Sequence, residues 1–399
     1  MKKYLFFMCF SVFGFISTGV KAQSGYANAA NKLLNSSSKL NIGGYGQIDY
    51  NQPLSADNYQ AGNLDVHRLI LLFGYRFSKN LQFVSEFEFE HVKEVFVEQA
   101  FIQYSFNNYL NFRAGLMLVP MGIINEYHEP TTFNGTERPW VDKYVSPTTW
   151  REIGLGFSGL IPGPSMKYQV YLMNGFAGYK DGEFLLSGKN GLRKARQKGA
   201  ESYINSPSVA TKIEYYGILG LNVGASTYFG ETQSSLYDGL AKNDIDAVSR
   251  ADSSVVGVSM IGIDLRYRRK GFELRGQLYR VWLSNTDQYN LMAENSGKTT
   301  NLGSQMFGWY AEMSYNVFNQ FDNIGTQLFP FVRLSNYDTH YAVNSSITAE
   351  DAFNNTIITT GLSWKIHQGV ALKSDLQFIK SRSQGSYSKS FNAGIGIWF

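Results

Sequence analysis

The feature that most constrains this chain is an alternation of apolar and polar residues that recurs along nearly its whole length. Successive side chains of a β-strand point to opposite faces, so a period of two indicates strands, and helical periodicity is weak throughout. The alternation therefore predicts an all-β chain of about sixteen strands. The expected strand ranges are 40–50, 67–77, 81–90, 96–106, 109–119, 151–161, 166–176, 207–216, 219–229, 255–268, 272–283, 306–317, 327–336, 356–366, 370–380 and 389–399.

The connections between these strands alternate in length. The short ones are 78–80, 107–108, 162–165, 217–218, 269–271 and 367–369, and the long ones are 51–66, 120–150, 177–206, 230–254, 284–305 and 337–355. Two connections, 91–95 and 318–326, depart from this pattern. Short periplasmic turns and longer external loops are typical of outer-membrane barrels, whereas a soluble β-sandwich has no reason to alternate loop lengths. We therefore predict a transmembrane antiparallel β-barrel over residues 39–399.

The two ends of the chain indicate the same destination. The last expected strand ends at Phe399, and Phe391, Ala393, Ile395 and Ile397 share its face. An all-apolar strand face suits the closing strand of a barrel surrounded by lipid, whereas in a soluble domain such an edge would invite aggregation.

The N-terminus resembles a secretory signal. Lys2 and Lys3 precede an apolar run too short to span a bilayer, and Val20-Lys21-Ala22 offers a cleavage site. We expect a signal peptide over residues 1–22, a short periplasmic tail over 23–38, and residence in the outer membrane of a Gram-negative-type cell, in contact with its lipid.

Composition excludes several classes of function. Cys9 lies inside the signal peptide, so the mature chain would have no thiol or disulfide chemistry. Removal of three signal-peptide lysines leaves 33 basic residues against 32 acidic ones, which gives no reason to expect nucleic acid as a partner. The 26 Tyr, 29 Phe and 39 Gly suit a barrel with an apolar outside and a polar inside.

Charged residues fall on one face of the expected strands. In the second strand, for example, Leu69 and Phe73 share one face while Arg68 and Arg76 share the other. A charge on the lipid face costs about 2–4 kcal/mol at the midplane, so this sorting supports a charged lumen. The expected basic lumen residues are Arg68, Arg76, Arg113, Lys167, Lys212, Arg266, Arg268, Arg275, Arg333, Lys365 and Lys373. The expected acidic ones are Glu86, Glu88, Glu90, Glu152, Glu214, Asp264, Glu273, Glu312 and Asp375.

Two interpretations of these charges remain open. The basic residues could form a path for anions, with acids on the opposite wall. Alternatively, opposite charges could pair across strands and stiffen the wall. Arg68, Arg76 and Arg113 are the best candidates for contact with ions because none has an acid beside it on its own strand face, although neighbouring strands could supply one.

Several segments in order resemble the phosphate-selective porin family, the O/P type of outer-membrane porin. The resemblance rests on Gly44-Tyr-Gly-Gln47, Arg68-Leu-Ile-Leu-Leu-Phe-Gly74, Phe101-Ile-Gln-Tyr104, Phe112-Arg-Ala-Gly-Leu-Met-Leu-Val-Pro-Met-Gly122 and Gly154-Leu-Gly156. It implies sixteen strands, a homotrimer and a pore narrowed by the third external loop. Family members that select phosphate use a dense arginine ladder and a lysine cluster, whereas the basic residues here are interleaved with acids.

The third external loop would be segment 120–150, which is long, aromatic and bounded by proline. Long ordered loops are usually functional, although this one could instead lie exposed on the rim. Following the resemblance, we expect it to fold into the lumen and narrow the pore. The residues expected to set this constriction are Glu126, His128, Glu129, Glu137 and Arg138, with Asp142 and Lys143.

No catalytic, cofactor or metal motif stands out. The run Gly154–Gly159 matches a dinucleotide-binding pattern, but it lies along a strand with no helix after it. The five histidines are scattered, and only His91, which follows three glutamates, could hold a metal at the mouth. We therefore predict a non-enzymatic porin for passive diffusion of small hydrophilic solutes and ions, with anions such as phosphate as one candidate class. The alternatives are a barrel hydrolase, a sugar-conducting channel and a structural barrel with a closed lumen.

Overall fold

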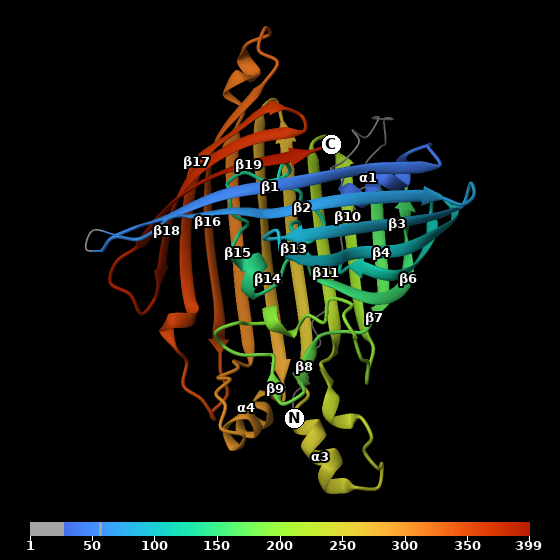
Figure 1. The fold of residues 1–399 in the computed structure, drawn as a ribbon, viewed down its shortest axis with the longest axis vertical. Helices are drawn as coiled ribbons and strands as arrows, with labels where there is room; N and C mark the ends of the chain where they lie inside the picture. Colours follow the sequence, from blue (N-terminus) through green and yellow to red (C-terminus); the bar gives the residue numbers. More distant parts are fainter. Residues whose placement is uncertain (1–27, 56–57) are drawn as a thin grey trace, which may run out of the picture.

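The computed structural model describes residues 28–55 and 58–399, and sixteen strands in this part of the chain close into one antiparallel barrel (Figure 1). The predicted fold class is therefore confirmed. The barrel strands are β1 Leu40–Leu54, β2 Asn63–Arg76, β3 Leu81–Glu90, β4 Glu94–Asn107, β5 Leu110–Leu118, β6 Arg151–Ile161, β7 Met166–Met173, β10 Ser208–Ile218, β11 Leu221–Glu231, β13 Gly257–Arg269, β14 Phe272–Ser284, β15 Gln305–Tyr315, β16 Gln327–Ala342, β17 Asn354–His367, β18 Val370–Ser381 and β19 Ser388–Trp398.

The other elements lie in the connections. A small sheet joins β8 Ala177–Lys180, β9 Glu183–Phe184 and β12 Gln233–Ser234, which come from two different long loops. The helices are α1 Ala29–Asn35, α2 Val141–Tyr144, α3 Ile245–Ser253 and α4 Thr286–Asn295, and the short 3-10 turns are η1 Arg193–Ala195, η2 Ser235–Tyr237, η3 Val317–Gln320 and η4 Asp351–Phe353. No helix in the described residues is long and apolar enough to cross a bilayer.

The barrel closes where its last strand meets its first. Strand β19 pairs with β1 from Tyr45 opposite Trp398 to Leu54 opposite Lys389, as the terminal alternation predicts. Beyond the last paired residues, the backbone of Phe399 exchanges two hydrogen bonds with that of Gly44, of 2.9 and 3.1 Å. Because a bilayer core offers no water to an unpaired strand edge, this seam satisfies groups that would otherwise be costly to bury.

The outside of the barrel is apolar and the inside is charged. Outward residues such as Leu155, Ile263 and Leu334 are exposed, whereas the charged side chains that alternate with them are buried. An exposed apolar surface that continues around a whole molecule indicates contact with lipid or with other subunits.

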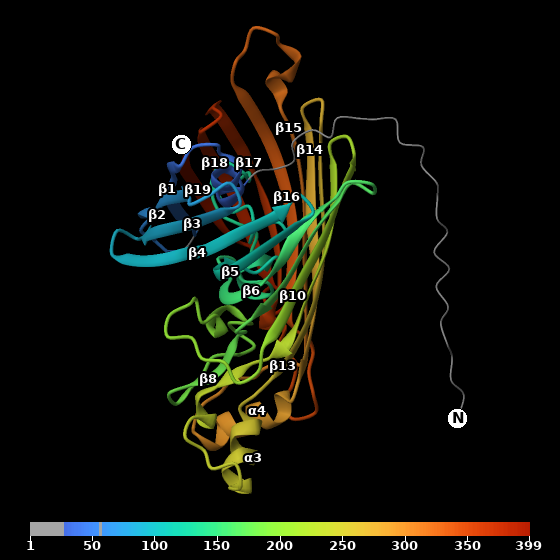
Figure 2. The same ribbon diagram turned by 90° about the vertical axis from the view of Figure 1, so that its right-hand side faces the viewer.

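The two ends of the barrel differ. Helices α3 and α4 belong to long connections and lie together at one end, while the C-terminus lies at the other (Figures 1 and 2). We call these the long-loop end and the short-turn end. Turns such as 270–271 and 368–369 lie at the short-turn end, as expected for the periplasmic side of an outer-membrane barrel.

The segment before the first strand contains a short helix that packs inside the barrel. Residues Ala29, Ala30 and Leu33 of α1 are buried, and Leu33 contacts the position of Gly74 on β2. Arg76 and Gln82 donate hydrogen bonds to carbonyl oxygens near the end of α1, namely those of Leu34 and Ser36. Helix α1 of the predicted tail therefore packs against the inner face of the barrel wall, while the predicted signal peptide over 1–22 lies outside the described residues.

The close packing at the seam can be tested by a substitution at Gly44. A Cβ atom at this position would lie 2.5 Å from the carbonyl oxygen of Ile70 and 2.7 Å from the ring of Phe399. We expect Gly44→Val to lower the free energy of unfolding by about 1–3 kcal/mol, the usual cost of overpacking. Gly163→Val is the matched control because nothing lies within 4 Å of its Cβ position. Equal unfolding transitions of the two variants in detergent would contradict this account of the seam.

Candidate pore constriction

The loop 120–150 lies inside the barrel, and most of its residues are buried. Its backbone is held by polar side chains of the wall. Gln277 on β14 accepts a hydrogen bond of 2.8 Å from the backbone of Ile123, and Asp375 on β18 accepts one of 2.7 Å from that of Thr136. Arg333 on β16 donates to the carbonyl oxygens of Asn134 and Glu137. The loop therefore spans the lumen between distant parts of the wall.

Charged residues of the loop contact charged and polar side chains of the wall. Glu126 accepts from Lys212 and Gln169, both at 2.6 Å, and Lys212 also lies 3.5 Å from Asp264. Glu137 accepts from Asn51 at 3.1 Å. These contacts give the charged groups hydrogen-bonding or oppositely charged partners in place of water. A charge in a low-dielectric interior needs such partners to offset the loss of its hydration.

The predicted basic lumen residues differ in what surrounds them. Arg68 lies 3.6 Å from Glu88 on the next strand, so the neighbour supplies the acid that its own strand lacks. Arg113 donates to Gln103 at 2.7 Å and to Tyr171 at 3.3 Å, both of which are neutral. Arg76 is occupied by α1, as described above. Of the three arginines favoured for contact with ions, two are therefore committed to structural contacts.

The remaining predicted wall residues form ion pairs or contacts with the loop. Arg266 pairs with Glu214 at 2.6 Å, Arg275 pairs with Glu312 at 2.9 Å, and Lys373 lies 3.8 Å from the ring centre of Phe133. Glu90 lies at the long-loop end, 3.9 Å from His91. These pairs follow the salt-bridge interpretation more closely than that of an open basic ladder.

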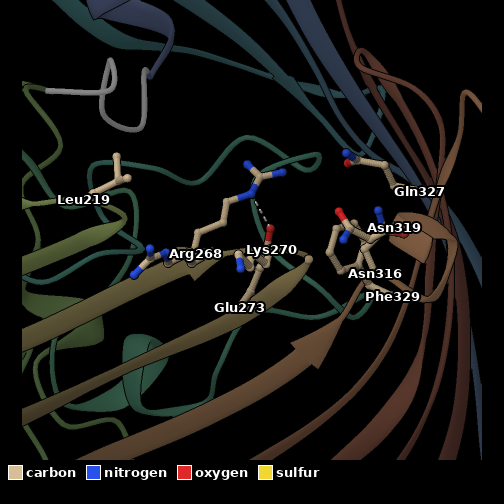
Figure 3. A pocket seen from close by; sticks show the side chains of 10 residues that line it. Leu219, Arg268, Lys270, Glu273, Asn316, Asn319, Gln327 and Phe329 are labelled. Atoms are coloured by element: carbon tan, nitrogen blue, oxygen red, sulfur yellow. Dashed lines mark ion pairs between the residues drawn. The ribbon is translucent and has the colours of Figure 1, made fainter. Parts of the chain in front are cut away.

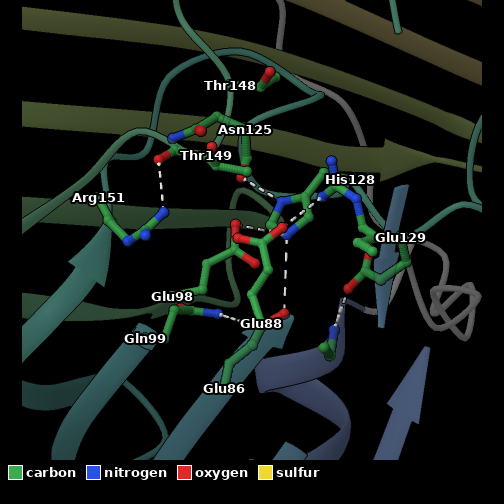
Figure 4. A network of polar contacts seen from close by, with 12 residues as sticks. Glu86, Glu88, Glu98, Gln99, Asn125, His128, Glu129, Thr148, Thr149 and Arg151 are labelled. Atoms are coloured by element: carbon green, nitrogen blue, oxygen red, sulfur yellow. Dashed lines mark hydrogen bonds and ion pairs between the residues drawn. The ribbon is translucent and has the colours of Figure 1, made fainter. Parts of the chain in front are cut away.

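A compact network joins the loop to strands β1, β3 and β4 (Figure 4). Nε2 of His128 lies 3.0 Å from the hydroxyl of Tyr45 and 3.4 Å from Glu98. The hydroxyl of Tyr45 lies 2.5 Å from Glu86. Glu129 accepts a hydrogen bond from the backbone of Ala29, so the loop also contacts α1.

For Glu98, one residue of this network, the alternation of apolar and polar residues predicts the wrong face of the strand. A strict period of two puts it on the lipid face with Ile102, yet the side chain is fully buried inside. The pairing of β3 with β4 shifts between Glu86–Gln99 and Phe87–Val97, so Glu98 is the extra residue of a β-bulge. The bulge turns both Glu98 and Gln99 inward. A carboxylate on an otherwise apolar predicted face was the signal for this irregularity.

Of two cavities of about 320 and 220 Å³, only the larger is lined by residues of the loop. The larger opens toward the long-loop end, where Arg138, Lys143 and Arg193 line it with Glu137 and other residues. Arg193 comes from the loop 177–206 and has no counterpart among the predicted site residues.

The smaller cavity lies at the short-turn end (Figure 3). It is lined by Arg268, Arg269, Lys270 and one acid, Glu273, which pairs with Arg268 at 2.8 Å. Basic residues therefore outnumber acids there, which favours negative ions electrostatically.

Burial shifts the pKa values of two loop residues. Burial raises the pKa of Asp142 to about 8, although Gln277 donates a hydrogen bond to it. Its second oxygen has no hydrogen-bond partner among the described residues, which a neutral carboxyl tolerates better than a carboxylate. Burial and the neighbouring charge of Arg68 lower the pKa of Arg138 to about 10.

Comparison with known sequences gives a relative of unassigned activity. No protein-family model matches the chain. An uncharacterised protein of Aquifex aeolicus (strain VF5) is 32% identical over 371 residues, which cover 89% of this chain and 79% of the relative. The chain belongs to the same family as that Aquifex protein. The resemblance to phosphate-selective porins stays a prediction.

Comparison with solved structures shows the fold. The Salmonella typhi OmpF complex with daunomycin covers 90% of this chain and 97% of its own at a TM-score of 0.55 and 12% identity. The anion-selective porin from Comamonas acidovorans covers 90% and 100% at 0.53 and 13% identity. OmpT of Vibrio cholerae, an outer membrane protein, covers 92% and 99% at 0.52 and 10% identity. At these identities the likeness is one of fold, that of outer-membrane porin barrels.

The contact between Lys212 and the loop can be tested by a double-mutant cycle. Lys212→Met leaves Glu126 and Asp264 buried without this cation, which typically costs about 3–5 kcal/mol in the free energy of unfolding. Glu126→Gln in the same chain should restore part of that loss. Lys242→Met, at an exposed loop position, should change stability by no more than about 0.5 kcal/mol. Additive effects of the two buried substitutions would contradict the pairing.

The raised pKa of Asp142 predicts a pH dependence of stability. Between the ordinary value of 3.8 and about 8, the folded protein holds a proton that the unfolded chain has released. This contribution to stability is complete below the unfolded pKa and is lost as the pH rises through the folded one. The free energy of unfolding should therefore fall more steeply from pH 5 to pH 8.5 in the wild type than in Asp142→Asn. Parallel pH profiles would show that Asp142 does not titrate in this range.

Proposed function

We propose that this protein is an outer-membrane porin, a water-filled channel for passive diffusion of small hydrophilic solutes and ions. The observation that carries the proposal is the loop 120–150 lying inside a closed sixteen-strand barrel with charged residues on its inner face. A barrel of this size is wider than its wall side chains can fill, so a loop folded inward can set the width of the remaining path. Porins among the structural relatives support a channel rather than a hydrolase.

We further propose that the channel favours anions. Arg138, Lys143 and Arg193 line the cavity on the long-loop side, and Lys143 is exposed there. Arg68 and the acids Glu90, Glu137 and Asp142 line this cavity as well, whereas the cavity at the other end is predominantly basic. A small excess of basic residues at each mouth raises the local concentration of anions, which include phosphate, without needing a continuous ladder between them. That one of the structural relatives is an anion-selective porin agrees with this preference.

The wall tyrosines favour ions over sugars as solutes. Tyr45, Tyr171, Tyr228, Tyr279 and Tyr310 point inward and are almost completely buried, so they pack against other side chains. A sugar path needs aromatic faces open to the solute, whereas the exposed lining of both cavities is mainly charged and polar. We also propose a homotrimer in the outer membrane, since one structural relative, Vibrio cholerae OmpT, was determined in a trimer form.

Planar bilayers test these proposals together. The purified protein should conduct in steps that come in multiples of three, and its reversal potential in a KCl gradient should indicate anion preference. Lys143→Glu and Arg193→Glu should each shift that potential toward cations because each reverses a charge beside the cavity on the long-loop side.

Lys242→Glu provides the matched control, since it makes the same charge change at an exposed position that lines neither cavity. An equal shift in the control would assign the effect to overall surface charge. A protein that folds into the bilayer but does not conduct would refute the porin proposal.

A further inference from the structure

Two groups of histidine and carboxylate side chains have ligand atoms that all lie within 4.8 Å of one another. One is Asp65, His67 and His91 at the long-loop end. The other is Glu86, Glu98 and His128, which joins two strands to the loop 120–150. We propose that the second group binds a divalent transition-metal ion, with Zn²⁺ as the best match, and that this ion fastens the loop to the barrel wall.

The hydroxyl of Tyr45 has one proton but several neighbouring acceptors, so these acceptors can also bind a cation. Its hydroxyl lies near three acceptors: Oε1 of Glu86 at 2.5 Å, Nε2 of His128 at 3.0 Å and Oε2 of Glu98 at 3.4 Å. A hydroxyl has one proton, so it can donate to only one of them. The two carboxylates are almost completely buried, so a proton on Glu86 or His128, the nearby charges of Arg68 and Arg151, or a metal ion must balance them.

The hydrogen bonds around Glu86, Glu98 and His128 orient these side chains so that the atoms that would bind a metal face one another. Nδ1 of His128 lies 3.0 Å from the carbonyl oxygen of Asn125, which can only accept, so Nδ1 carries a proton. Nε2 then presents its lone pair to the carboxylates, as metal-binding histidines do when a carbonyl orients the ring. Gln99 donates to Oε2 of Glu86 at 2.6 Å and so orients its other oxygen. Oε1 of Glu98 receives no hydrogen bond from the described residues.

Distances and donor types agree with a small divalent ion. Nε2 of His128 lies 3.4 Å from Glu98 and 3.9 Å from Glu86. Ligand atoms placed tetrahedrally about 2.1 Å from zinc lie roughly 3.4 Å apart, so small movements would complete the site. One imidazole with two carboxylates suits Zn²⁺ better than Ca²⁺ or Mg²⁺, which prefer oxygen ligands alone. Figure 4 shows Glu86, Glu98 and His128 close together, and the hydroxyl of Tyr45 lies beside them, 3.0 Å from Nε2 of His128.

The β-bulge is an independent sign of a built site. Without the extra residue, Glu98 would face lipid and only Glu86 would meet His128. The bulge interrupts the ladder of hydrogen bonds between β3 and β4 and brings a second carboxylate into a fully buried position. Bulges of this kind commonly re-aim a side chain at a functional site.

The group of Asp65, His67 and His91 is a poorer metal site, because the histidine nitrogen that faces its carboxylates carries a proton. Nε2 of His67 lies 3.0 Å from a guanidinium nitrogen of Arg68, which can only donate, so Nε2 must accept. A neutral His67 then carries its proton on Nδ1, the atom that faces Asp49 and Asp65. That proton lies where Nδ1 of His67 would have to bind the metal ion. This group therefore serves as the control in the experiment.

The test uses the full-length protein refolded in detergent with a chelator and then dialysed against ZnCl₂. We expect about one zinc ion per chain by elemental analysis, and a higher temperature for heat-induced unfolding with zinc than without it. His128→Ala and Glu98→Gln should each weaken binding at least tenfold. Gln99→Met, which removes only the group that orients Glu86, should weaken it by roughly 10- to 100-fold.

His91→Ala should bind zinc as the wild type does, because His91 belongs to the other group. Absence of stoichiometric zinc in the refolded wild type would overturn the proposal and leave protons on Glu86 or His128, with Arg68 and Arg151, to balance the buried carboxylates. Loss of zinc in His91→Ala but not in Glu98→Gln would assign the metal to the long-loop end instead. The wild-type stoichiometry decides the proposal even if a variant fails to fold.

Discussion

The structure depends on one constraint: a backbone that crosses hydrocarbon must find all of its hydrogen-bond partners within the protein. The pairing of β19 with β1 meets this constraint because it leaves the barrel without an edge. Closure then divides every strand into a face toward lipid and a face toward the lumen. Charges such as Glu312 and Arg333 can lie only on the inner face, so the lumen collects them at high density.

A dense set of buried charges must be neutralised, which pairs within the wall do for the most part, and the loop 120–150 adds further contacts. Glu126 meets Lys212, and the loop backbone meets Arg333 and Asp375. The loop is thus held by the charges that a wide barrel brings together. Basic residues remain in excess mainly at the two mouths, where water can reach them.

Alternation alone predicted the fold well because strand faces and seam pairing follow from local rules. All sixteen expected strands overlap observed ones, and several of the expected lumen charges, such as Glu86, Asp264 and Arg333, are buried. Alternation could not predict the inward turn of Glu98, since a bulge depends on the register of two strands. It also could not supply the partner of Arg68, which lies on another strand, or the packing of α1, a short segment whose stability comes from the barrel around it. The acidic partner of each basic residue likewise depends on which strands are neighbours in the barrel. The order of residues along a single strand does not determine this.

The attachment of the loop to opposite parts of the wall has a mechanical consequence. It touches β3 and β4 through His128, β10 through Glu126, and β15 and β16 through Asn134. A sheet closed into a wide cylinder can be flattened by lateral pressure, because its strands slide more easily than they stretch. The loop acts as a cross-brace that opposes such flattening. Such a brace would keep the cross-section of the lumen constant while the surrounding membrane changes tension or thickness.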